Sequence, residues 1–313
     1  MCRFLLYKGK SSVLIADLLT RPAHSIINQS FDSRLRIDTR RPLNGDGFGV
    51  GWYQSEHDES PCIFTSTLPA WNNVNLTRLA EKIKSPLVFA HVRATTTGLA
   101  SEANCHPWQY GNLMWMHNGN ISGFDQIRRK LLATLADEVF NFVQGTTDSE
   151  CAFALFLNQL ENPESPYHTP EELKEAMLQM IALLNKWTRE VGVTEPSLMN
   201  FAVTDGRTVI CTRYISSATQ EAASLYFSSG TRFESYKPGH YRMIKSDKRE
   251  DIVVVASEPL TFEQADWITI PTNTLVVITP RFNVLLYPIK DENYNPQDRH
   301  QPVDLSCVYN FKK

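Results

Sequence analysis

The sequence predicts an α+β fold in which two antiparallel β-sheets are covered by helices. Three observations lead to this prediction. Short β-rich runs fill both ends of the 313-residue chain, helical periodicity dominates the part between them, and tight turns such as Asp205-Gly206 favour antiparallel hairpins. The order of strands, helices and strands favours one domain, predicted over residues 2–290, with residues 291–313 as a C-terminal tail.

The predicted strands are short runs rich in β-branched and aromatic residues and bounded by turn-forming residues. In the first half of the chain they are 2–7, 47–53, 62–67, 87–92 and 113–118. In the second half they are 198–205, 208–214, 223–229, 251–258, 274–280 and 283–289.

Helical patterns lie between predicted strands, and most of them lie between the two sets. Apolar residues recur at helical spacing over 76–83 and over 124–131. The segment 148–160 is apolar almost all round, which predicts a buried helix, and 171–190 is more amphipathic. Residues 161–170 are polar and proline-rich, as in a loop.

The composition is that of an ordinary globular protein. Apolar residues make up 42% and charged residues 21%, and the formal net charge is −3, so electrostatics do not favour nucleic acid or an anionic membrane as a partner. No apolar run approaches the roughly 20 residues that span a bilayer, and the charged segment 8–12 interrupts what could be a signal peptide. The six cysteines show no paired spacing, which predicts neither a zinc site nor a disulfide framework but a reducing, cytoplasmic location.

Cys2 allows two interpretations. As a small apolar residue it could simply begin a buried strand, since free cysteine packs well in cores. If Met1 is removed, however, Cys2 carries a thiol and a free α-amine together, which makes it a nucleophile with its own base.

Five clusters of polar and glycine residues, all at predicted strand or helix ends, favour the second interpretation. They lie at 44–49 (NGDGFG), 91–98 (HVRATTTG), 104–108 (NCHPW), 117–120 (HNGN) and 146–150 (TTDSE). Together with Cys2, in this order, they resemble the motifs of the class II glutamine amidotransferases, a branch of the N-terminal nucleophile hydrolases. The resemblance implies the four-layer αββα sandwich of that fold and a hydrolase that needs no cofactor.

The resemblance also implies a mechanism in which Cys2 attacks a γ-glutamyl amide and forms a thioester. The α-amine titrates at about 7.7–8.0, so it can take the proton of a thiol whose ordinary pKa is about 8.5, directly or through a water. The family's Asn-Gly pair, here Asn118 and Gly119, would donate hydrogen bonds to the oxyanion. The alternative for this pair is a plain Asn-Gly turn.

The remaining family positions imply a binding site for the γ-glutamyl head group. Arg93 would bind the α-carboxylate, for which a planar guanidinium is suited. Asp148 would bind the α-ammonium, although it could also be only the N-cap of its helix. Asn44, Gly45 and Asp46 would line the same pocket, where glycines would let the backbone come close to Cys2.

Two other patterns are less informative. The glycine-rich segment 45–49 runs into a predicted strand, whereas a phosphate-binding loop opens a helix, so a nucleotide site is not expected. Cys105 and His106 are neighbours whose side chains should point to opposite sides of an extended chain. The family pattern places His106 in the substrate site, where we expect a structural hydrogen-bonding role, and the histidine spacing predicts no metal site.

A closer resemblance covers nearly the whole chain. The segments 1–10, 18–36 and 255–271 are similar to the stand-alone amidotransferase subunit of a fungal cytosolic glutathione-degradation complex. This similarity implies hydrolysis of glutathione to glutamate and cysteinylglycine, together with a metallopeptidase-like protein subunit. Glutamine carries the same γ-glutamyl head group, so the residues alone do not distinguish the two substrates.

Two alternatives to this function remain. The chain could be a glutaminase that supplies ammonia to a separate synthetase, or a non-catalytic structural subunit. The second would be expected to lack the nucleophile, the arginine or the oxyanion asparagine, and all three are present. Ala94 departs from synthetase-linked relatives, in which an aromatic residue commonly follows the arginine and helps to organise a closing lid.

Overall fold

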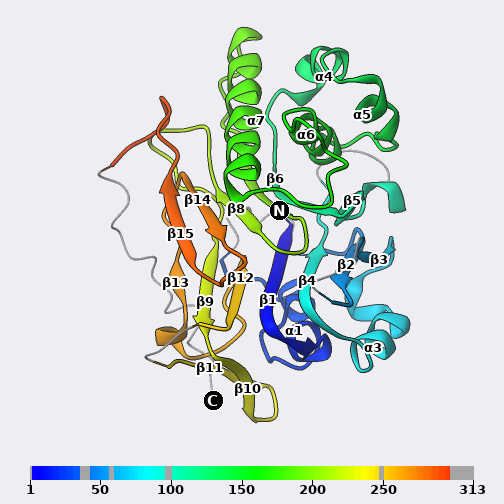
Figure 1. Ribbon diagram of the computed structural model, residues 1–313, viewed down its shortest axis with the longest axis vertical. Helices are drawn as coiled ribbons and strands as arrows, with labels where there is room; N and C mark the ends of the chain where they lie inside the picture. The colour runs from blue at the N-terminus through cyan, green and yellow to red at the C-terminus, as the bar shows by residue number, and fades with distance from the viewer. Residues whose placement is uncertain (1, 36–42, 56–59, 96–100, 247–249, 297–313) are drawn as a thin grey trace.

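Two antiparallel sheets lie face to face, and each is covered on its outer side (Figure 1). This arrangement is seen in a computed structural model that describes residues 2–35, 43–55, 60–95, 101–246 and 250–296. The predicted α+β class and the αββα layering are therefore confirmed.

The first sheet has seven strands in the order β13-β9-β12-β1-β4-β2-β3. Its strands in chain order are β1 (Arg3–Leu14), β2 (Phe48–Tyr53), β3 (Cys62–Ser66), β4 (Lys84–Val92), β9 (Tyr226–Gly230), β12 (Ile252–Ala256) and β13 (Ile268–Thr269). The central strand β1 pairs with β4 and β12, so the N-terminus enters the middle of this sheet.

The second sheet has six strands in the order β15-β14-β8-β7-β6-β5. They are β5 (Trp108–Tyr110), β6 (Leu113–Asn120), β7 (Leu198–Thr204), β8 (Val209–Arg213), β14 (Thr274–Ile278) and β15 (Val284–Pro288). The predicted Asp205-Gly206 turn joins β7 to β8, and Gly206 adopts a positive φ of 86° as such a turn requires.

Alternating apolar side chains form the core between the sheets. Phe4 and Leu6 of β1 and Phe89 of β4 meet Met114 and Met116 of β6 in one buried cluster. Because neighbouring strand residues face opposite sides, the residues between them face the outer layers. This alternation also decides which functional side chains reach the space between the sheets.

Helices cover the outer face of the six-stranded sheet. They are α4 (Phe124–Ala133), α5 (Asp137–Phe142), α6 (Asp148–Leu157) and α7 (Pro170–Glu190). The predicted all-apolar helix is α6, whose residues from Ser149 to Leu157 are all buried. The long α7 begins with a capping box in which Thr169 and Glu172 satisfy each other's backbone N–H groups, with Pro170 in the first turn.

The outer face of the seven-stranded sheet is covered differently. Three short helices, α1 (Ala16–Leu19), α2 (Ile26–Gln29) and α3 (Val74–Ala80), share this layer with the two-stranded hairpin of β10 (Arg232–Lys237) and β11 (His240–Ile244). The remaining elements are three short 3₁₀ turns, η1 (Ala70–Asn72), η2 (Glu102–Asn104) and η3 (Gln264–Asp266).

Most predicted elements are present, with two kinds of difference. β1 extends to Leu14, beyond the predicted end at residue 7, because its polar second half still pairs with the first residues of β4. The hairpin β10–β11, the short strands β5 and β13 and the helices α1, α2 and α5 are not among the elements that the sequence predicts. β10 is mostly exposed and polar, and α1 and α2 have only four residues each, so neither shows a periodic pattern long enough to read.

The segment after β15 is attached to the domain. The Tyr214 hydroxyl donates to Asp291 Oδ2 at 2.5 Å, and Asn293 Nδ2 donates to the Tyr214 hydroxyl at 3.0 Å. Residues 297–313 of the predicted tail lie outside the described residues, and the domain boundary at 290 stays a prediction.

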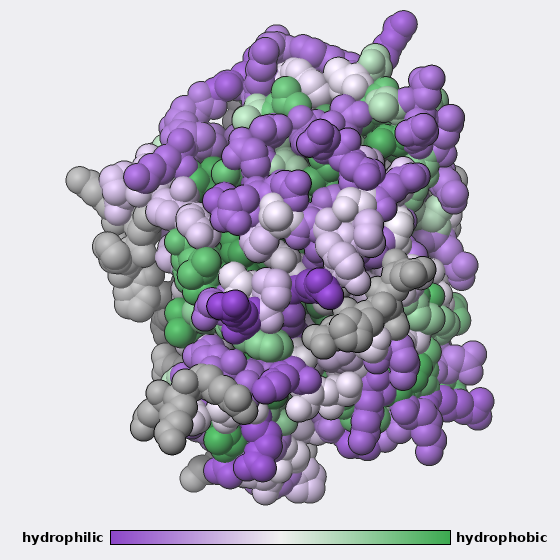
Figure 2. All heavy atoms as spheres, in the orientation of Figure 1, coloured by the Kyte–Doolittle hydropathy of each residue, from purple (hydrophilic) through white to green (hydrophobic). Residues whose placement is uncertain are grey.

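The visible face of the molecule is mostly hydrophilic (Figure 2). A clear hydrophobic group on it lies over the edge strand β15, where Leu285 and Leu286 are exposed. Among the described helices, none combines the length and the apolar character that crossing a membrane requires.

Candidate active site

The predicted nucleophile lies between the two sheets. Cys2 precedes β1, and the pairing of Arg3 with Val92 of β4 brings it beside the end of that strand. Its Sγ lies 3.4 Å from the Ala94 backbone N–H and 3.6 Å from the Ala94 carbonyl oxygen. The Ala94 residue therefore holds the sulfur through its backbone, with the N–H donating to Sγ and the carbonyl accepting from the thiol.

Arg93 lies next to this thiol. Every second residue of a strand faces the same side of the sheet. Arg93 therefore points into the space between the sheets, as Phe89 does, and Cys2 points there as Phe4 does. Arg93 as a whole is 4% exposed, and its Nη1 donates to the Asp46 carbonyl oxygen at 3.5 Å. A long hydrogen bond to one carbonyl leaves most of the five N–H donors free for an anionic group.

The segment 44–47 is joined to the end of β4. The Arg93 N–H donates to the Gly47 carbonyl at 2.9 Å, and the Asp46 N–H donates to the Arg93 carbonyl at 3.2 Å. The Asp46 carboxylate accepts from the Thr95 N–H at 2.7 Å. Asn44 is fully buried and donates to the Val92 carbonyl at 3.4 Å, so this segment forms a wall beside Arg93.

The glycines of this wall serve a purpose that differs from the predicted one. The sequence predicts that they let the backbone approach Cys2. Gly47 has a φ of +112°, and a Cβ there would lie 2.7 Å from the Cys105 sulfur, while a Cβ on Gly45 would lie 3.0 Å from the Trp71 ring. The residues nearest to these two glycines are therefore Cys105 and Trp71 rather than Cys2. Glycine is needed at position 47 because the backbone there has a positive φ.

The Asn-Gly pair comes from the facing sheet. Asn118 and Gly119 lie within β6, paired with Asn200 and Met199 of β7, so the alternative of a plain turn is wrong. The Asn118 amide is fully buried, and its Nδ2 donates to Ser257 Oγ at 3.3 Å. Gly119 has no room for a side chain, because a Cβ there would lie 1.8 Å from the Leu198 carbonyl oxygen.

Asp148 lies at the same end of β6. Its Oδ2 accepts from the Ile121 N–H at 2.7 Å, one residue beyond the strand, and Oδ1 accepts from the Ser149 hydroxyl at 3.2 Å. The alternative role as N-cap belongs instead to Thr147, whose hydroxyl accepts from the Glu150 N–H. Asp148 is the first residue of α6, where the helix dipole favours a carboxylate.

Three buried histidines form a contiguous group behind Arg93. His106 Nδ1 lies 2.7 Å from His91 Nε2, and His91 Nε2 lies 3.1 Å from the His117 carbonyl oxygen. His117 Nδ1 bonds the Ser149 hydroxyl at 2.8 Å, which links the group to α6. Burial lowers the pKa of His91 to about 3 and lowers the pKa of His106 and His117 as well, so all three are neutral near pH 7.

Cys105 and His106 have different partners, as the extended-chain argument predicted. The Cys105 thiol donates to the Ser66 carbonyl at 3.5 Å and to the Ser101 carbonyl at 3.6 Å, whereas His106 packs against His91 and Trp108. Burial raises the pKa of Cys105 to about 11, so this thiol is a poor nucleophile. Within the described ranges, no three histidine, cysteine or carboxylate side chains are placed to hold a metal ion.

Four buried polar residues near Cys2 were not predicted from the sequence. Ser257 and Glu258 follow β12, and Glu258 bonds Arg3 and His24, all with at most 1% exposure. The sequence does contain a signal for Ser257 and Glu258, because they directly follow the apolar run IVVVA. Polar residues that continue a buried strand need hydrogen-bond partners.

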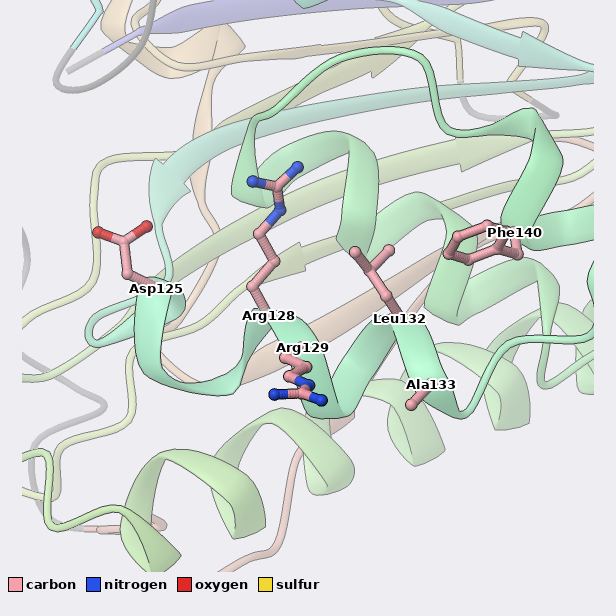
Figure 3. Close-up of a pocket in the computed structure, with 6 residues that line it drawn as sticks. All are labelled: Asp125, Arg128, Arg129, Leu132, Ala133 and Phe140. Atoms are coloured by element: carbon pink, nitrogen blue, oxygen red, sulfur yellow. The ribbon is translucent and has the colours of Figure 1, made fainter.

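A pocket between α4 and α5 is separate from this site. Its volume is about 500 Å³, and Figure 3 shows Arg128, Arg129 and Leu132 of α4 and Phe140 of α5 around it. None of the predicted site residues lines this pocket. It is therefore not the place where Cys2 would meet a substrate.

Comparison with known proteins decides the family. The profile of the class II glutamine amidotransferases matches residues 15–297. The chain belongs to the class II glutamine amidotransferases. This amidotransferase is 54% identical over 309 residues to the probable glutamine amidotransferase DUG3 of Saccharomyces cerevisiae, with 94% of this chain and 86% of the yeast protein covered.

A second relative is more distant. The γ-glutamyl-hercynylcysteine sulfoxide hydrolase of Mycolicibacterium smegmatis is 29% identical to this amidotransferase over 122 residues, which cover 39% of this chain and 52% of that enzyme. Membership of this family makes the protein a hydrolytic enzyme rather than a structural subunit.

Solved structures agree on the fold of this amidotransferase. A glutamine aminotransferase class-II domain protein from Silicibacter pomeroyi superposes with a TM-score of 0.61 at 23% identity, covering 92% of this chain and 99% of that one. The phosphoribosylpyrophosphate amidotransferase of Bacillus subtilis superposes with a TM-score of 0.55 at 14% identity, covering 92% of this chain and 49% of that one. At these identities the similarity concerns the N-terminal nucleophile hydrolase fold alone.

Proposed function

We propose that this protein hydrolyses the γ-glutamyl amide bond of glutathione, with Cys2 as the nucleophile. The observation that carries the proposal is the position of the Cys2 sulfur. It lies against the Ala94 backbone, one residue from the Arg93 guanidinium, in the space that the Asn118 amide borders from the facing sheet. A thiol, an anion-binding guanidinium and an amide donor around one space suit acyl transfer from a substrate with a carboxylate at one end.

The proposed reaction has two halves, each with the same oxyanion site. After removal of Met1, the Cys2 α-amine takes the thiol proton, and Sγ bonds to the γ-carbonyl carbon of the substrate. The negative charge on the carbonyl oxygen is stabilised by the Asn118 side-chain amide and the Gly119 N–H. The α-amine then returns its proton to the leaving nitrogen as the C–N bond breaks, which leaves a thioester. Water attacks the thioester and releases glutamate and the free thiol.

The head group is bound by charges at its two ends. Arg93 binds the α-carboxylate of the substrate. Asp148 binds the α-ammonium, because its hydrogen bonds with Ile121 and Ser149 use only some of the acceptor sites of the carboxylate. Asn44, Gly45 and Asp46 line the pocket beside Arg93, and His106 has a structural role through its contact with His91 of β4. These roles rest on the geometry and on the family's pattern together.

Glutathione is proposed as the substrate from two resemblances. The segments 1–10, 18–36 and 255–271 are similar to the amidotransferase subunit of a fungal glutathione-degradation complex. The mycobacterial relative is named for a γ-glutamyl bond to a sulfur-containing amino acid derivative. The leaving group of glutathione is cysteinylglycine, for whose recognition the sequence suggests no residues. We therefore propose that a metallopeptidase-like protein subunit completes the leaving-group side, in the cytoplasm, where the cysteines stay reduced.

A second candidate is a glutaminase that supplies ammonia to a separate synthetase. It is favoured by the family's substrate and by the name of the yeast relative, which is a glutamine amidotransferase. Both candidates require the same head-group contacts, so they differ only in the leaving group.

Steady-state turnover of glutathione and of glutamine, by the chain alone and with its co-purified partner, tests the proposal. We expect glutathione hydrolysis to be weak with the chain alone and to rise strongly with the partner, releasing glutamate and cysteinylglycine. Asn118→Ala should reduce turnover by about 10²–10³-fold in the complex, as the loss of one oxyanion donor does. Turnover of glutamine but never of glutathione would establish the glutaminase, and full glutathione turnover without the partner would refute partner dependence.

A further inference from the structure

Ser257 and Glu258 follow β12 and reach opposite faces of the seven-stranded sheet. Both are fully buried, and neither belongs to the predicted site. Ser257 contacts Asn118 of the facing sheet, whereas Glu258 contacts His24 in the outer layer. This division follows from the extended chain, in which consecutive side chains point to opposite sides.

Ser257 connects the nucleophile's strand to the oxyanion donor. Its Oγ accepts from the Phe4 N–H at 3.0 Å and from Asn118 Nδ2 at 3.3 Å, and its own N–H donates to the Phe4 carbonyl at 3.0 Å. Binding one of the two amide hydrogens of Asn118 fixes the plane of the amide. The other hydrogen stays available to an oxyanion.

Glu258 connects to Cys2 through Arg3. The Arg3 guanidinium donates from Nε to Glu258 Oε1 at 2.9 Å and from Nη1 to the Cys2 carbonyl oxygen at 2.9 Å. The same carboxylate accepts from the Ser33 hydroxyl at 2.5 Å and the Arg34 N–H at 3.0 Å. Burial acts to raise the pKa of Glu258, but the hydrogen bond to His24 and the charge of Arg3 outweigh it and hold the carboxyl well below its usual range.

The nucleophile needs such a connection for a physical reason. An N-terminal residue has no peptide bond on its amine side, and chain ends fray unless something holds them. The hydrogen bond from Arg3 holds the Cys2 carbonyl, and the contacts to Ala94 hold its sulfur. These two restraints together orient the α-amine that serves as the base in the proposed reaction.

We propose that Ser257 and Glu258 are positioning residues for this reaction, and the proposal rests on the function proposed above. Ser257 sets the orientation of the Asn118 amide, and Glu258 sets the orientation of the Cys2 backbone through the Arg3 guanidinium. One dipeptide thereby places the oxyanion donor of one sheet relative to the nucleophile of the other. A displacement of about 1 Å between reacting groups can cost about 10²-fold in rate.

Two conservative variants test the two connections in the full-length chain with its partner. Ser257→Ala removes the acceptor of the Asn118 amide, and Arg3→Lys keeps a charge opposite Glu258 but loses the planar fork that also reaches Cys2. We expect kcat on glutathione, or on glutamine if that is the substrate, to fall by about 10–100-fold with KM within about two-fold.

The matched controls make the same chemical changes elsewhere in the fold. Ser85→Ala removes a fully buried hydroxyl of β4 that bonds only backbone carbonyls and the Leu87 N–H. Arg213→Lys changes a buried arginine that binds Glu221 and the Ala223 and Ile270 carbonyls. Both should lower the melting temperature as much as their counterparts do, while kcat stays near the wild-type value.

Alkylation of Cys2 by iodoacetamide, followed by peptide mass spectrometry, separates this proposal from the proposed function because it needs no substrate. Arg3→Lys should slow alkylation at pH 7 by at least about five-fold relative to Arg213→Lys, because a misplaced α-amine no longer activates the thiol. Ser257→Ala should leave the alkylation rate unchanged, because this substitution affects the Asn118 amide and not the Cys2 thiol. If both variants match their controls in kcat and in alkylation, the proposal is wrong, even where the wild type hydrolyses γ-glutamyl amides. If the wild type hydrolyses none, the proposed function fails, and slower alkylation of Arg3→Lys still supports the connection between Glu258 and Cys2.

Discussion

At the scale of single residues, the two thiols near Arg93 differ because their surroundings differ. In the proposed mechanism the Cys2 thiol has its own α-amine as base, and the Ala94 N–H points at the Cys2 sulfur. Cys105 is buried among backbone carbonyls, and this burial raises its pKa to about 11. Proximity to the site therefore does not make Cys105 a second nucleophile.

This difference gives the first prediction, which concerns Cys2→Ala and Cys105→Ala. The first variant should abolish γ-glutamyl hydrolysis, because it removes the sulfur that is proposed to form the thioester, and the second should keep most of it. Steady-state turnover measures both, and the intact mass of wild-type protein should show a chain that begins at Cys2. Active protein that retains Met1 would contradict the role of the α-amine, and activity in Cys2→Ala would contradict the choice of nucleophile.

Arg93→Lys gives the second prediction. Lysine keeps the positive charge but loses the planar pair of donors, so KM for the γ-glutamyl substrate should rise by about ten-fold or more while kcat changes less. Arg78→Lys on α3 is the control, because Arg78 lies in the last turn of a helix in the outer layer. Unchanged kcat and KM in Arg93→Lys would rule out a carboxylate-binding role.

At the scale of elements, the site depends on strand ends that are brought together by antiparallel pairing. β1 and β4 pair so that Cys2 and Arg93 become neighbours, and β6 pairs with β7 so closely that position 119 accepts only glycine. The histidine group bridges the two sheets, since His91 lies on β4 and bonds the carbonyl of His117 on β6. Packing of neutral imidazoles thus contributes to the alignment of the two halves of the site.

The third prediction concerns the pH dependence of this packing. His91 has a folded-state pKa of about 3, and burial lowers the pKa of His106 and His117 too, whereas the unfolded chain titrates at about 6.5. Below pH 6.5 the unfolded state therefore binds protons that the folded state does not. The free energy of unfolding should fall as pH drops from 6.5 toward 3, by up to about 1.4 kcal/mol per pH unit for each histidine.

Urea unfolding between pH 8 and pH 5 measures this dependence. His91→Gln should reduce the slope below pH 6.5, because one fewer buried imidazole resists protonation. His240→Gln changes a histidine of the β10–β11 hairpin outside the group, where slight burial also lowers the pKa, and it should reduce the slope less than His91→Gln does. Equal slopes in the wild type and His91→Gln would contradict the assignment of neutral, buried imidazoles.

At the scale of the whole molecule, the last described residues complete the six-stranded sheet's outer layer. Asn293 accepts from Asn273 through its carbonyl at 3.0 Å, and Asn295 donates to the Ala218 carbonyl at 3.2 Å. Tyr214 is fully buried, and its hydroxyl depends on Asp291 and Asn293 for two of its hydrogen bonds. These contacts hold the segment after β15 to the domain.

The fourth prediction compares two truncated chains. A chain ended at Lys290 loses these contacts and leaves buried polar groups of Tyr214 and Asn185 with fewer partners, so its free energy of unfolding should be lower by about 2–4 kcal/mol. A chain ended at Pro296 keeps the contacts and is the matched control. Chemical denaturation of both measures the difference, and equal stabilities would place 291–296 outside the folded domain.

Local patterns in the sequence were enough to predict the fold class, a resemblance to the family and the candidate nucleophile. Strand patterns with period 2, the all-apolar α6 and the amphipathic α7 are local, so periodicity reveals them. Cys2, Arg93 and Asn118 were found because each lies in a short motif at the end of a predicted element. These signals need no knowledge of which residues distant in the chain come into contact.

How these motifs meet depends on the packing of the two sheets against each other. The connection from Glu258 to Arg3 spans 255 positions of the chain, and that from Ser257 to Asn118 spans 139, so no local pattern indicates them. Gly47 and Gly119 are likewise required by neighbours from other segments, Cys105 and Leu198. Side-chain alternation assigns each residue to a face, but the facing partner is set by how the two sheets pack.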